Sequence, residues 1–367
     1  SRLCPNANCM LQWTRWSLRL MSWTINRQPE YDSELLMETT HWDGVKVRVY
    51  IPRDETMSHS DGAIVYMHGG GLVFGSTEMY ESQTRTMARL ARTRLFVSID
   101  YRLAPETVFP GQLEDCERVL EFVIANGPRQ YGIDPNKIVV MGDSAGGNLA
   151  AAIAQRRRNR ETEPKILGQV LLYPWLQMAD MQTYSYRYWY REMDGLSFLD
   201  PLSLGYYALW YAGVDVNARP DFALAVTVNG HLSDTARSVA AKSMDFAALP
   251  QTFRDDVNGS DSPRTEQPIS ELADYMEPFL TNASFAPLMA TDLSGLPSTL
   301  VVSCEFDLLR DEGALYAHRL KQAGNVSFSQ SYGCSKGMET FFDLPMRFFQ
   351  ESLGEIMLWT NKLLREA

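Results

Sequence analysis

The sequence predicts an α/β protein whose mainly parallel sheet is covered by helices on both faces. Continuous apolar runs rich in β-branched residues recur along the chain, and stretches with helical spacing separate them. One such run ends in Gly-x-Ser-x-Gly at 142–146 and passes directly into an Ala-rich helix former. With 367 residues, of which 45% are hydrophobic and 22% charged, the chain is long enough to bury one large core and a smaller subdomain.

The N-terminal stretch 11–23 has the spacing of an amphipathic helix. Its apolar residues are leucine, methionine and tryptophan, and Arg15 and Arg19 stand between them. We expect this helix to pack on the protein's own core. The pattern leaves two alternatives open, which are covering a pocket and lying on a membrane surface.

The elements of the core follow in alternating order. An alternating strand at 45–51 ends at Pro52, and the later strands are continuous apolar runs. We expect further strands at 63–67, 95–99, directly before Gly142, 170–173, 299–302 and 326–328, with helices at 79–91, 113–124, after Ser144 and at 311–323.

The strand pattern stops between 176 and about 281. This segment holds a tyrosine-rich stretch at 184–190, a helical stretch at 202–211 and a polar passage at 255–268. So long an excursion inside a sheet protein usually forms a lid or cap over a site. We therefore expect an N-terminal helical cap segment at 1–44, a core made of 45–175 and 286–367, and a cap insertion at 176–285.

The Gly-x-Ser-x-Gly turn places Ser144 between a strand and a helix, which is the nucleophile-elbow pattern. Gly142 and Gly146 suit this turn because strand and helix approach too closely to leave room for a Cβ. The amide of Ala145 lies at a helix N-terminus, where it can donate a hydrogen bond to an oxyanion. We therefore expect Ser144 to be a nucleophile.

Three consecutive glycines follow the strand at 63–67, in the sequence His68-Gly69-Gly70-Gly71. Glycines at the C-terminal end of a strand let backbone amides turn inward, so we expect Gly69 and Gly70 to be the other oxyanion donors. His68 is expected to hold this loop by hydrogen bonds rather than to act as a base.

An acid belongs just past the end of a later strand, because such sites follow the chain order Ser, acid, His. Asp307 lies five residues after the strand at 299–302, and we predict it to be that acid. Asp311 and Glu312 are expected to be ordinary first-turn residues of the next helix.

Composition excludes several classes of partner. The net charge of −11 and the lack of a basic stripe interleaved with aromatics argue against nucleic acid. The five cysteines show no metal-ligand spacing, so we expect no metal and no cofactor. Cys116 and Cys304 are expected to be small buried residues, although one disulfide fits the count.

No window reaches the roughly 18 apolar residues of a membrane span, so the chain as given is expected to be soluble. Because it begins with Ser1 rather than Met, a preceding anchor or signal fits as well.

Several motifs together resemble the hormone-sensitive lipase branch of the α/β-hydrolases, and most of all its arylacetamide deacetylase and neutral cholesterol ester hydrolase members. In chain order these motifs are His68–Gly71, Tyr101–Glu106, Gly142–Asn148, Tyr173–Trp175 and Asp307–Gly313. The resemblance spans roughly residue 45 to the C-terminus. It implies the α/β-hydrolase fold and a serine carboxylesterase or aryl-amide deacetylase with Ser144 as nucleophile and Asp307 as acid, acting on a small apolar ester or amide. It also implies a place in the endoplasmic reticulum membrane or lumen, which the glycosylation sequons at Asn258, Asn282 and Asn325 would fit.

The chain departs from this family at one position. The family places its catalytic His directly before a glycine after the last strand, and here Lys336 precedes Gly337. None of the five histidines follows the last strand, and His318, the nearest, belongs to a helix that we expect behind the sheet. Without imidazole, only oxyanion-hole and binding catalysis remain, so we expect impaired turnover. A Ser-Lys pair is less favoured, because Asp307 would keep the ammonium of Lys336 charged.

Three interpretations follow. The first is a serine esterase by descent in which the histidine is replaced, and the intact Ser144, Asp307 and glycine loop favour it. The second is a catalytically dead protein that keeps the pocket and binds a ligand. The third is an interaction protein that uses the surface of the cap.

Overall fold

The structure is a computed structural model that describes residues 6–25, 31–54, 56, 58–158, 160, 164–193, 199–255, 264–332 and 347–367. In this part of the chain eight strands form one sheet, in the order β1-β2-β4-β3-β5-β6-β7-β8. The first two pairings, β1 with β2 and β2 with β4, are antiparallel, and all the others are parallel. The strands are β1 (Leu35–Trp42), β2 (Val45–Pro52), β3 (Ser60–Met67), β4 (Thr93–Asp100), β5 (Ile138–Asp143), β6 (Gly168–Leu172), β7 (Ser298–Cys304) and β8 (Ser327–Tyr332).

The helices fall into those that flank the sheet and those of the segment between β6 and β7. The first group is α1 (Ala7–Ile25), α2 (Glu81–Ala91), α3 (Gly111–Tyr131), α4 (Ala145–Arg158), α11 (Arg310–Gln322) and α13 (Arg347–Glu366). The second is α5 (Tyr184–Tyr188), α6 (Pro201–Ala212), α7 (Asp221–Thr227), α8 (Asp234–Ser243), α9 (Gln251–Asp255) and α10 (Ser270–Leu280), with short turns of π- or 3-10 helix at Trp189–Met193, Phe246–Ala248 and Pro287–Met289.

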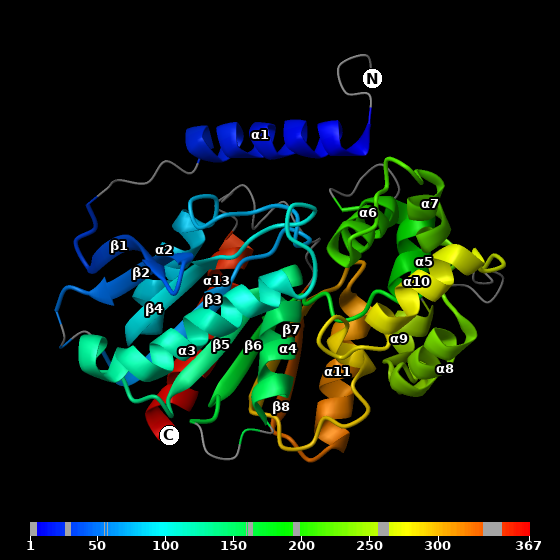
Figure 1. The fold of residues 1–367 in the computed structure, drawn as a ribbon. Helices are drawn as coiled ribbons and strands as arrows, with labels where there is room; N and C mark the ends of the chain where they lie inside the picture. The colour runs from blue at the N-terminus through cyan, green and yellow to red at the C-terminus, as the bar shows by residue number, and fades with distance from the viewer. Residues whose placement is uncertain are drawn as a thin grey trace.

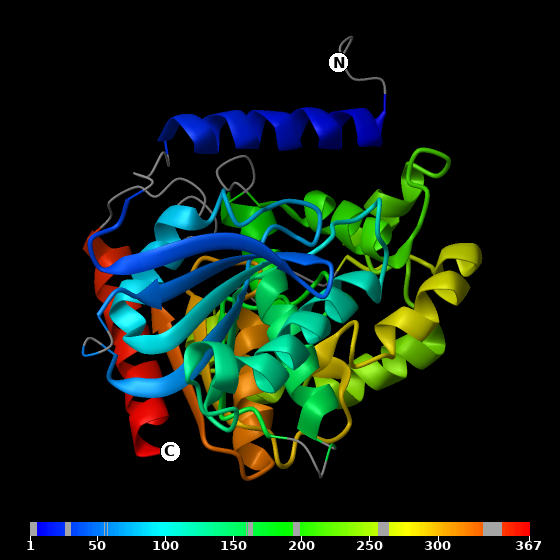
Figure 2. The ribbon, with the colours of Figure 1, turned by 60° about the vertical axis from the view of Figure 1, so that its left-hand side comes forward.

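Helices cover both faces of the sheet, as the sequence predicted. α3 and α4 pack against each other on one face, and α2 and α13 pack against each other on the opposite face (Figures 1 and 2). Strand β3 is fully buried along its apolar run, and Ile64 and Val65 have no exposed surface. The small side chains 150–152 on α4 let this helix lie directly on β5 and β6. The hydrophobic core therefore lies in two layers, above and below the sheet.

The predicted strands and helices of the core are confirmed, with ends that differ by a few residues. Two elements were not anticipated. β1 pairs with β2 along its full length, so residues 35–42 belong to the sheet and not to the helical segment that the sequence predicted for 1–44. The C-terminal helix α13 packs on α2 and on β3. β1 has neither the continuous apolar run nor the regular alternation that identified the other strands.

The segment between β6 and β7 contains helices and no strand among its described residues, and these helices gather at one side of the molecule (Figure 1). Helix α6 begins with Pro201 after the cap residue Asp200, whose carboxylate accepts the amide of Ser203. It ends at Gly213, which has a φ of +87°. The division of the chain into core and cap units stays a prediction.

Helix α1 lies across the edge of the sheet at which the parallel strands end (Figures 1 and 2). Leu11 and Leu18, on the inner face of α1, are buried, as expected for a helix that packs on the protein's own core. The side chain of Arg15 donates to the carbonyl oxygen of Val73, 2.8 Å away, and to that of Ala104, in the loops that follow β3 and β4. Among the described residues, no helix is both long enough and apolar enough to cross a membrane.

Candidate active site

The turn between β5 and α4 carries Ser144 in a strained conformation. Its φ is +54°, in the left-handed region that residues with a side chain rarely adopt. The neighbouring glycines leave no room for side chains, because a Cβ on Gly142 would overlap the carbonyl of Gly146, and a Cβ on Gly146 would overlap the carbonyl oxygen of Met67. The amide of Ser144 donates to the carbonyl oxygen of Leu172 at 2.8 Å. The expected tight turn is confirmed.

Ser144 is half-buried and is followed directly by the first residue of α4, Ala145. The amide of a first helical residue has no acceptor within its own helix. Because the N-terminus of a helix is also the positive end of its dipole, this amide is suited to bind a negative oxygen. Ala145 as an oxyanion donor stays a prediction.

The glycine loop after β3 differs from the prediction at Gly69. The amide of Gly69 donates to Oδ1 of Asp143 at 2.7 Å. Gly69 is therefore not the oxyanion donor that the sequence suggested, since its hydrogen is already given to a buried carboxylate. The amides of Gly70 and Gly71 have no acceptor in the part of the chain that the structure describes. Both glycines have positive φ, +109° and +64°, which glycine adopts without cost.

His68 holds the glycine loop, as expected. Its ring stacks between Tyr80 and Tyr101, with centroid distances of 5.3 Å and 4.3 Å. Its Nδ1 lies 2.8 Å from the carbonyl oxygen of Gly69, and its own carbonyl accepts the hydroxyl of Tyr101 at 2.6 Å. Burial lowers the pKa of His68, so the imidazole is neutral and structural.

Asp143, which directly precedes Ser144, is a buried carboxylate that the sequence analysis did not single out. Oδ1 accepts the hydroxyl of Tyr66 at 2.6 Å as well as the amide of Gly69, and Oδ2 accepts the hydroxyl of Tyr80 at 3.2 Å. Burial raises the pKa of Asp143, while the three donors oppose that rise. The only sequence signal for it was its place inside the Gly-x-Ser-x-Gly motif.

Asp307 lies in the loop between β7 and α11 and is buried. Its Oδ1 accepts the amide of Leu309 at 3.1 Å. β5 and β7 are both parallel neighbours of β6, so Ser144 and Asp307 follow strands that end at the same edge of the sheet. This is the placement that the sequence predicted for the two residues.

Lys336 lies outside the described residues, and its place beside Asp307 stays a prediction. Strand β8, which precedes it, is parallel to β7, and Tyr332 pairs with Cys304 at the end of both strands. His318 belongs to α11, which packs on β7 and β8. His231 is buried within the helical segment, where its Nε2 lies 2.9 Å from the carbonyl oxygen of Met178.

Asp311 and Glu312 do more than begin a helix. Both stand in the first turn of α11, as predicted, but both are fully buried. Asp311 accepts the amide of Ser185 at 2.7 Å. Glu312 accepts the amide of Leu176 through Oε1 and the side-chain amide of Gln177, at 3.1 Å, through Oε2. The two carboxylates therefore fasten the start of the helical segment to the helix that follows the acid loop.

Helix α6 brings an aromatic side chain onto the glycine loop. A Cβ on Gly71 would overlap the ring of Tyr207, and the same ring meets Phe74 edge-on at a centroid distance of 5.5 Å. Burial raises the pKa of Tyr207 to about 12, so its hydroxyl stays protonated. Tyr207 is thus an aromatic residue of the predicted cap that lies against the candidate oxyanion loop.

The cysteines follow the expectation only in part. Cys116 is a buried free thiol, and burial raises its pKa. Cys304 is buried but is disulfide-bonded, which corrects the expectation of a simple small residue. Within the described ranges, no group of three or more His, Cys, Asp or Glu side chains is placed to hold a metal ion.

Comparison with known proteins agrees with this geometry. The sequence is 34% identical to arylacetamide deacetylase-like 2 of Homo sapiens, over 81% of this chain and 72% of that protein. It is 33% identical to neutral cholesterol ester hydrolase 1 of Bos taurus, over 80% of this chain and 71% of that protein. The structure is similar to a thermostable carboxylesterase from a metagenomic library, with a TM-score of 0.69 and 27% identity over 96% of this chain and 97% of that one.

A Pyrobaculum calidifontis esterase gives a TM-score of 0.66 at 28% identity, over 96% of this chain and 93% of that one. The sequence profile of the alpha/beta hydrolase fold matches residues 64–246 and 260–335. The sheet order, the strained serine between β5 and α4, and these matches lead to one conclusion: the chain belongs to the α/β-hydrolase family, in the branch of the serine carboxylesterases and deacetylases.

Proposed function

We propose that this chain hydrolyses carboxylic esters or aryl amides through an acyl-enzyme on Ser144. The observation that carries the proposal is the strained Ser144 at the N-terminus of α4. Beside it lies the glycine loop, in which the amides of Gly70 and Gly71 have no acceptor among the described residues. A nucleophile and a set of oxyanion donors are the two parts that acyl transfer needs from a protein. No cofactor or metal enters this mechanism.

In the first step the Ser144 oxygen attacks the carbonyl carbon, and the bond to the leaving alcohol or amine breaks as that group takes up a proton. Water then attacks the acyl-enzyme, releases the acid and returns a proton to Ser144. The amides of Gly70 and Ala145 hold the negative oxygen in both steps. Since Gly69 donates to Asp143, Gly71 takes its place as the third donor.

Lys336 stands at the family's histidine position, and this sets the expected rate. A lysine amine with a usual pKa of about 10.4 is protonated near neutral pH and accepts no proton from Ser144. Asp307, placed beside it by the family pattern, would keep that charge in place. We therefore propose that turnover is slow and rests on oxyanion binding and positioning.

The test is a matched assay of the wild type and Lys336→His with a short p-nitrophenyl ester. Restoring imidazole should raise kcat by about 10²- to 10⁴-fold, the usual contribution of a positioned base. Ser144→Ala in the same background should remove the gain. A folded Lys336→His protein with no gain would contradict the proposal.

The second candidate is a binding protein of the same fold that has lost turnover, and the lysine at position 336 is the observation that favours it. Such a protein would bind an apolar ester or amide, or the product acid, and release it unchanged. It predicts tight binding of the ester to the wild type by calorimetry, with no acid released over the same period.

We propose that the substrates are small apolar esters or amides, because the names of the relatives refer to apolar amides and esters. The curated relatives are a deacetylase of arylacetamides and a hydrolase of cholesterol esters. Tyr207 and Phe74 form an apolar wall beside Gly71, which suits an apolar acyl or alcohol group. Tyr207→Ala should raise KM for a long-chain ester more than for an acetate ester.

We propose that the exposed face of α1 rests on a membrane surface, at the endoplasmic reticulum as in the family resemblance. The rings of Trp13 and Trp16 lie 5.3 Å apart between centroids, tilted by 32°, and the two residues are 58% and 56% exposed. Met10 and Leu20 are exposed on the same helix. Tryptophans are suited to the interface between lipid and water. Binding to phosphatidylcholine vesicles should fall for Trp13→Ser with Trp16→Ser and be unchanged for Leu224→Ser, an exposed leucine on α7.

A further inference from the structure

Asp143 joins the two parts of the proposed catalytic machinery. It is bonded directly to Ser144 in the chain, and its Oδ1 lies 2.7 Å from the amide nitrogen of Gly69, the residue before Gly70. The approach is close enough that a Cβ on Gly69 would overlap the carboxylate. One side chain therefore connects the nucleophile turn directly to the glycine loop, in addition to the pairing of β3 with β5.

The second donor to Oδ1, the hydroxyl of Tyr66 at 2.6 Å, comes from the strand that leads into the glycine loop. Tyr66 lies on β3 and pairs with Met141 of β5 in the sheet. Strand β3 thus contacts the carboxylate both just before and just after it ends. Rotation of the Asp143 side chain would break both hydrogen bonds at once.

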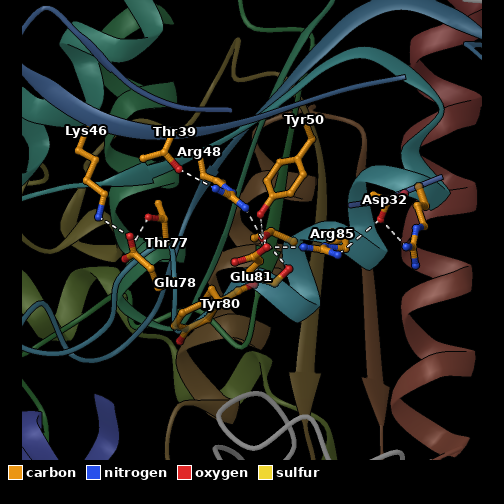
Figure 3. A network of polar contacts seen from close by, with 12 residues as sticks. Asp32, Thr39, Lys46, Arg48, Tyr50, Thr77, Glu78, Tyr80, Glu81 and Arg85 are labelled. Carbon is orange, nitrogen blue, oxygen red and sulfur yellow. Dashed lines mark hydrogen bonds and ion pairs between the residues drawn. The ribbon is translucent and has the colours of Figure 1, made fainter. Parts of the chain in front are cut away.

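The third donor, Tyr80, is itself held rigidly. Its ring stacks on His68, and its carbonyl accepts the hydroxyl of Thr84 at 2.9 Å. The Thr84 hydroxyl lies 2.7 Å from the hydroxyl of Tyr50. In Figure 3 Tyr80 lies beside a polar network around Glu81, whose carboxylate accepts Arg48 at 2.9 Å. The position of the Tyr80 phenol is thus set by α2 and β2, outside the active site.

Taking a carboxylate out of water is costly, and Asp143 has only 2% of its surface exposed. Three hydrogen bonds from neutral donors compensate part of that cost. An apolar residue would fill the same space without it. A buried hydrogen-bond acceptor kept at this position is consistent with a side chain that is needed for what it holds in place.

We propose that Asp143 is a positioning residue whose carboxylate ties the glycine loop to the Ser144 turn and so sets where the oxyanion donors stand. The proposal rests on the proposed acyl-transfer function for its kinetic consequence. It concerns hydrogen bonding rather than charge: an acceptor of the same shape should serve nearly as well as the carboxylate.

The experiment compares Asp143→Ala, Asp143→Asn and Tyr80→Phe in the Lys336→His background, with kcat and KM for a short ester. Asp143→Ala should lower kcat by about 10²-fold with little change in KM, because displaced donors weaken only the transition state. Asp143→Asn should keep most of kcat, because its Oδ1 still accepts Gly69 and Tyr66. Tyr80→Phe should lose less than Asp143→Ala, and Tyr275→Phe, which removes a hydroxyl bonded to Ala212 in the helical segment, should lose nothing.

Amide hydrogen exchange of the peptide 68–74 supplies a second readout that needs no turnover. Asp143→Ala should exchange faster there, and Asp143→Asn should exchange like the parent. Unchanged kcat in Asp143→Ala overturns the proposal, and so does a loss in Asp143→Asn as large as in Asp143→Ala.

If Lys336→His shows no turnover, the proposed acyl-transfer function fails, and hydrogen exchange alone tests the role of Asp143. Unchanged exchange in Asp143→Ala would then overturn the proposal that Asp143 positions the glycine loop. If Asp143→Ala does not fold, Tyr80→Phe decides, since an unchanged kcat and unchanged exchange in that variant contradict it.

Discussion

At the scale of single residues, Ser144 combines a reactive position with a conformation that costs stability. A φ of +54° is unfavourable for a residue with a Cβ by roughly 1–2 kcal/mol. The surrounding backbone enforces it: the amide donates to Leu172, and the carbonyl accepts the amide of Trp175 at 2.9 Å. Strain of this kind persists where a function requires the geometry.

We expect Ser144→Gly to be more stable than Ser144→Ala by about 1 kcal/mol, because glycine adopts the left-handed region without a Cβ clash. Both changes remove the hydroxyl, so their difference isolates the backbone strain. Urea unfolding of the two variants measures it, and both should fail to turn over ester. Equal stability, or a more stable alanine variant, would show that the turn stores no strain at this residue.

At the scale of elements, the first turn of α11 connects three parts of the molecule. Helix α11 begins directly after the loop that carries Asp307, and it packs on β7. Asp311 and Glu312 in its first turn bind Ser185 and Gln177, at the beginning of the helical segment. The hydroxyl of Ser185 adds a further bond, to the carbonyl oxygen of Leu308 at 2.6 Å. Helical segment and acid loop are thus expected to keep a fixed relation.

Glu312→Ala should lower the free energy of unfolding by about 2–4 kcal/mol, since the amide of Leu176 and the side chain of Gln177 lose their buried acceptor. Hydrogen exchange should rise in the stretch 176–185 and stay unchanged in β3. Asp274→Ala, which removes an exposed carboxylate on α10, is the matched control and should change neither quantity. Wild-type exchange of 176–185 in Glu312→Ala would mean that the anchor lies elsewhere.

At the scale of the whole molecule, stability should depend on pH through His231. Burial lowers its pKa from 6.5 to about 4, and its Nε2 contacts the carbonyl of Met178. Because the folded pKa lies below the unfolded one, the unfolded chain binds the proton first. Stability that is fully present above pH 6.5 is therefore lost as the pH falls towards 4.

The loss between these two pH values should be about 3 kcal/mol larger in the wild type than in His231→Gln, which has no titrating ring. Denaturant unfolding at several pH values measures both proteins, and the difference between them cancels the contributions of the other groups. Parallel stability curves for the two proteins would contradict a buried neutral imidazole.

The sequence predicted most of the core because the buried parallel strands are continuous apolar runs, and because Gly142 and Gly146 have a steric reason to be glycine. It failed at Gly69, since no local pattern tells which amide of three glycines a distant carboxylate will take. Asp311 and Glu312 read as ordinary first-turn residues because their partners are more than a hundred positions away. Strand β1, half-exposed at the sheet edge, lacked a clear alternation.

The most direct test of the central claim, that Ser144 is the nucleophile of an acyl-transfer site, is the mass of the intact protein after exposure to a fluorophosphonate. The wild type should gain one adduct, mapped to Ser144, and Lys336→His should gain it faster because a base is restored. Ser144→Ala should gain none. A folded Lys336→His protein that stays unmodified, or an adduct mapped to any other residue, would contradict the claim.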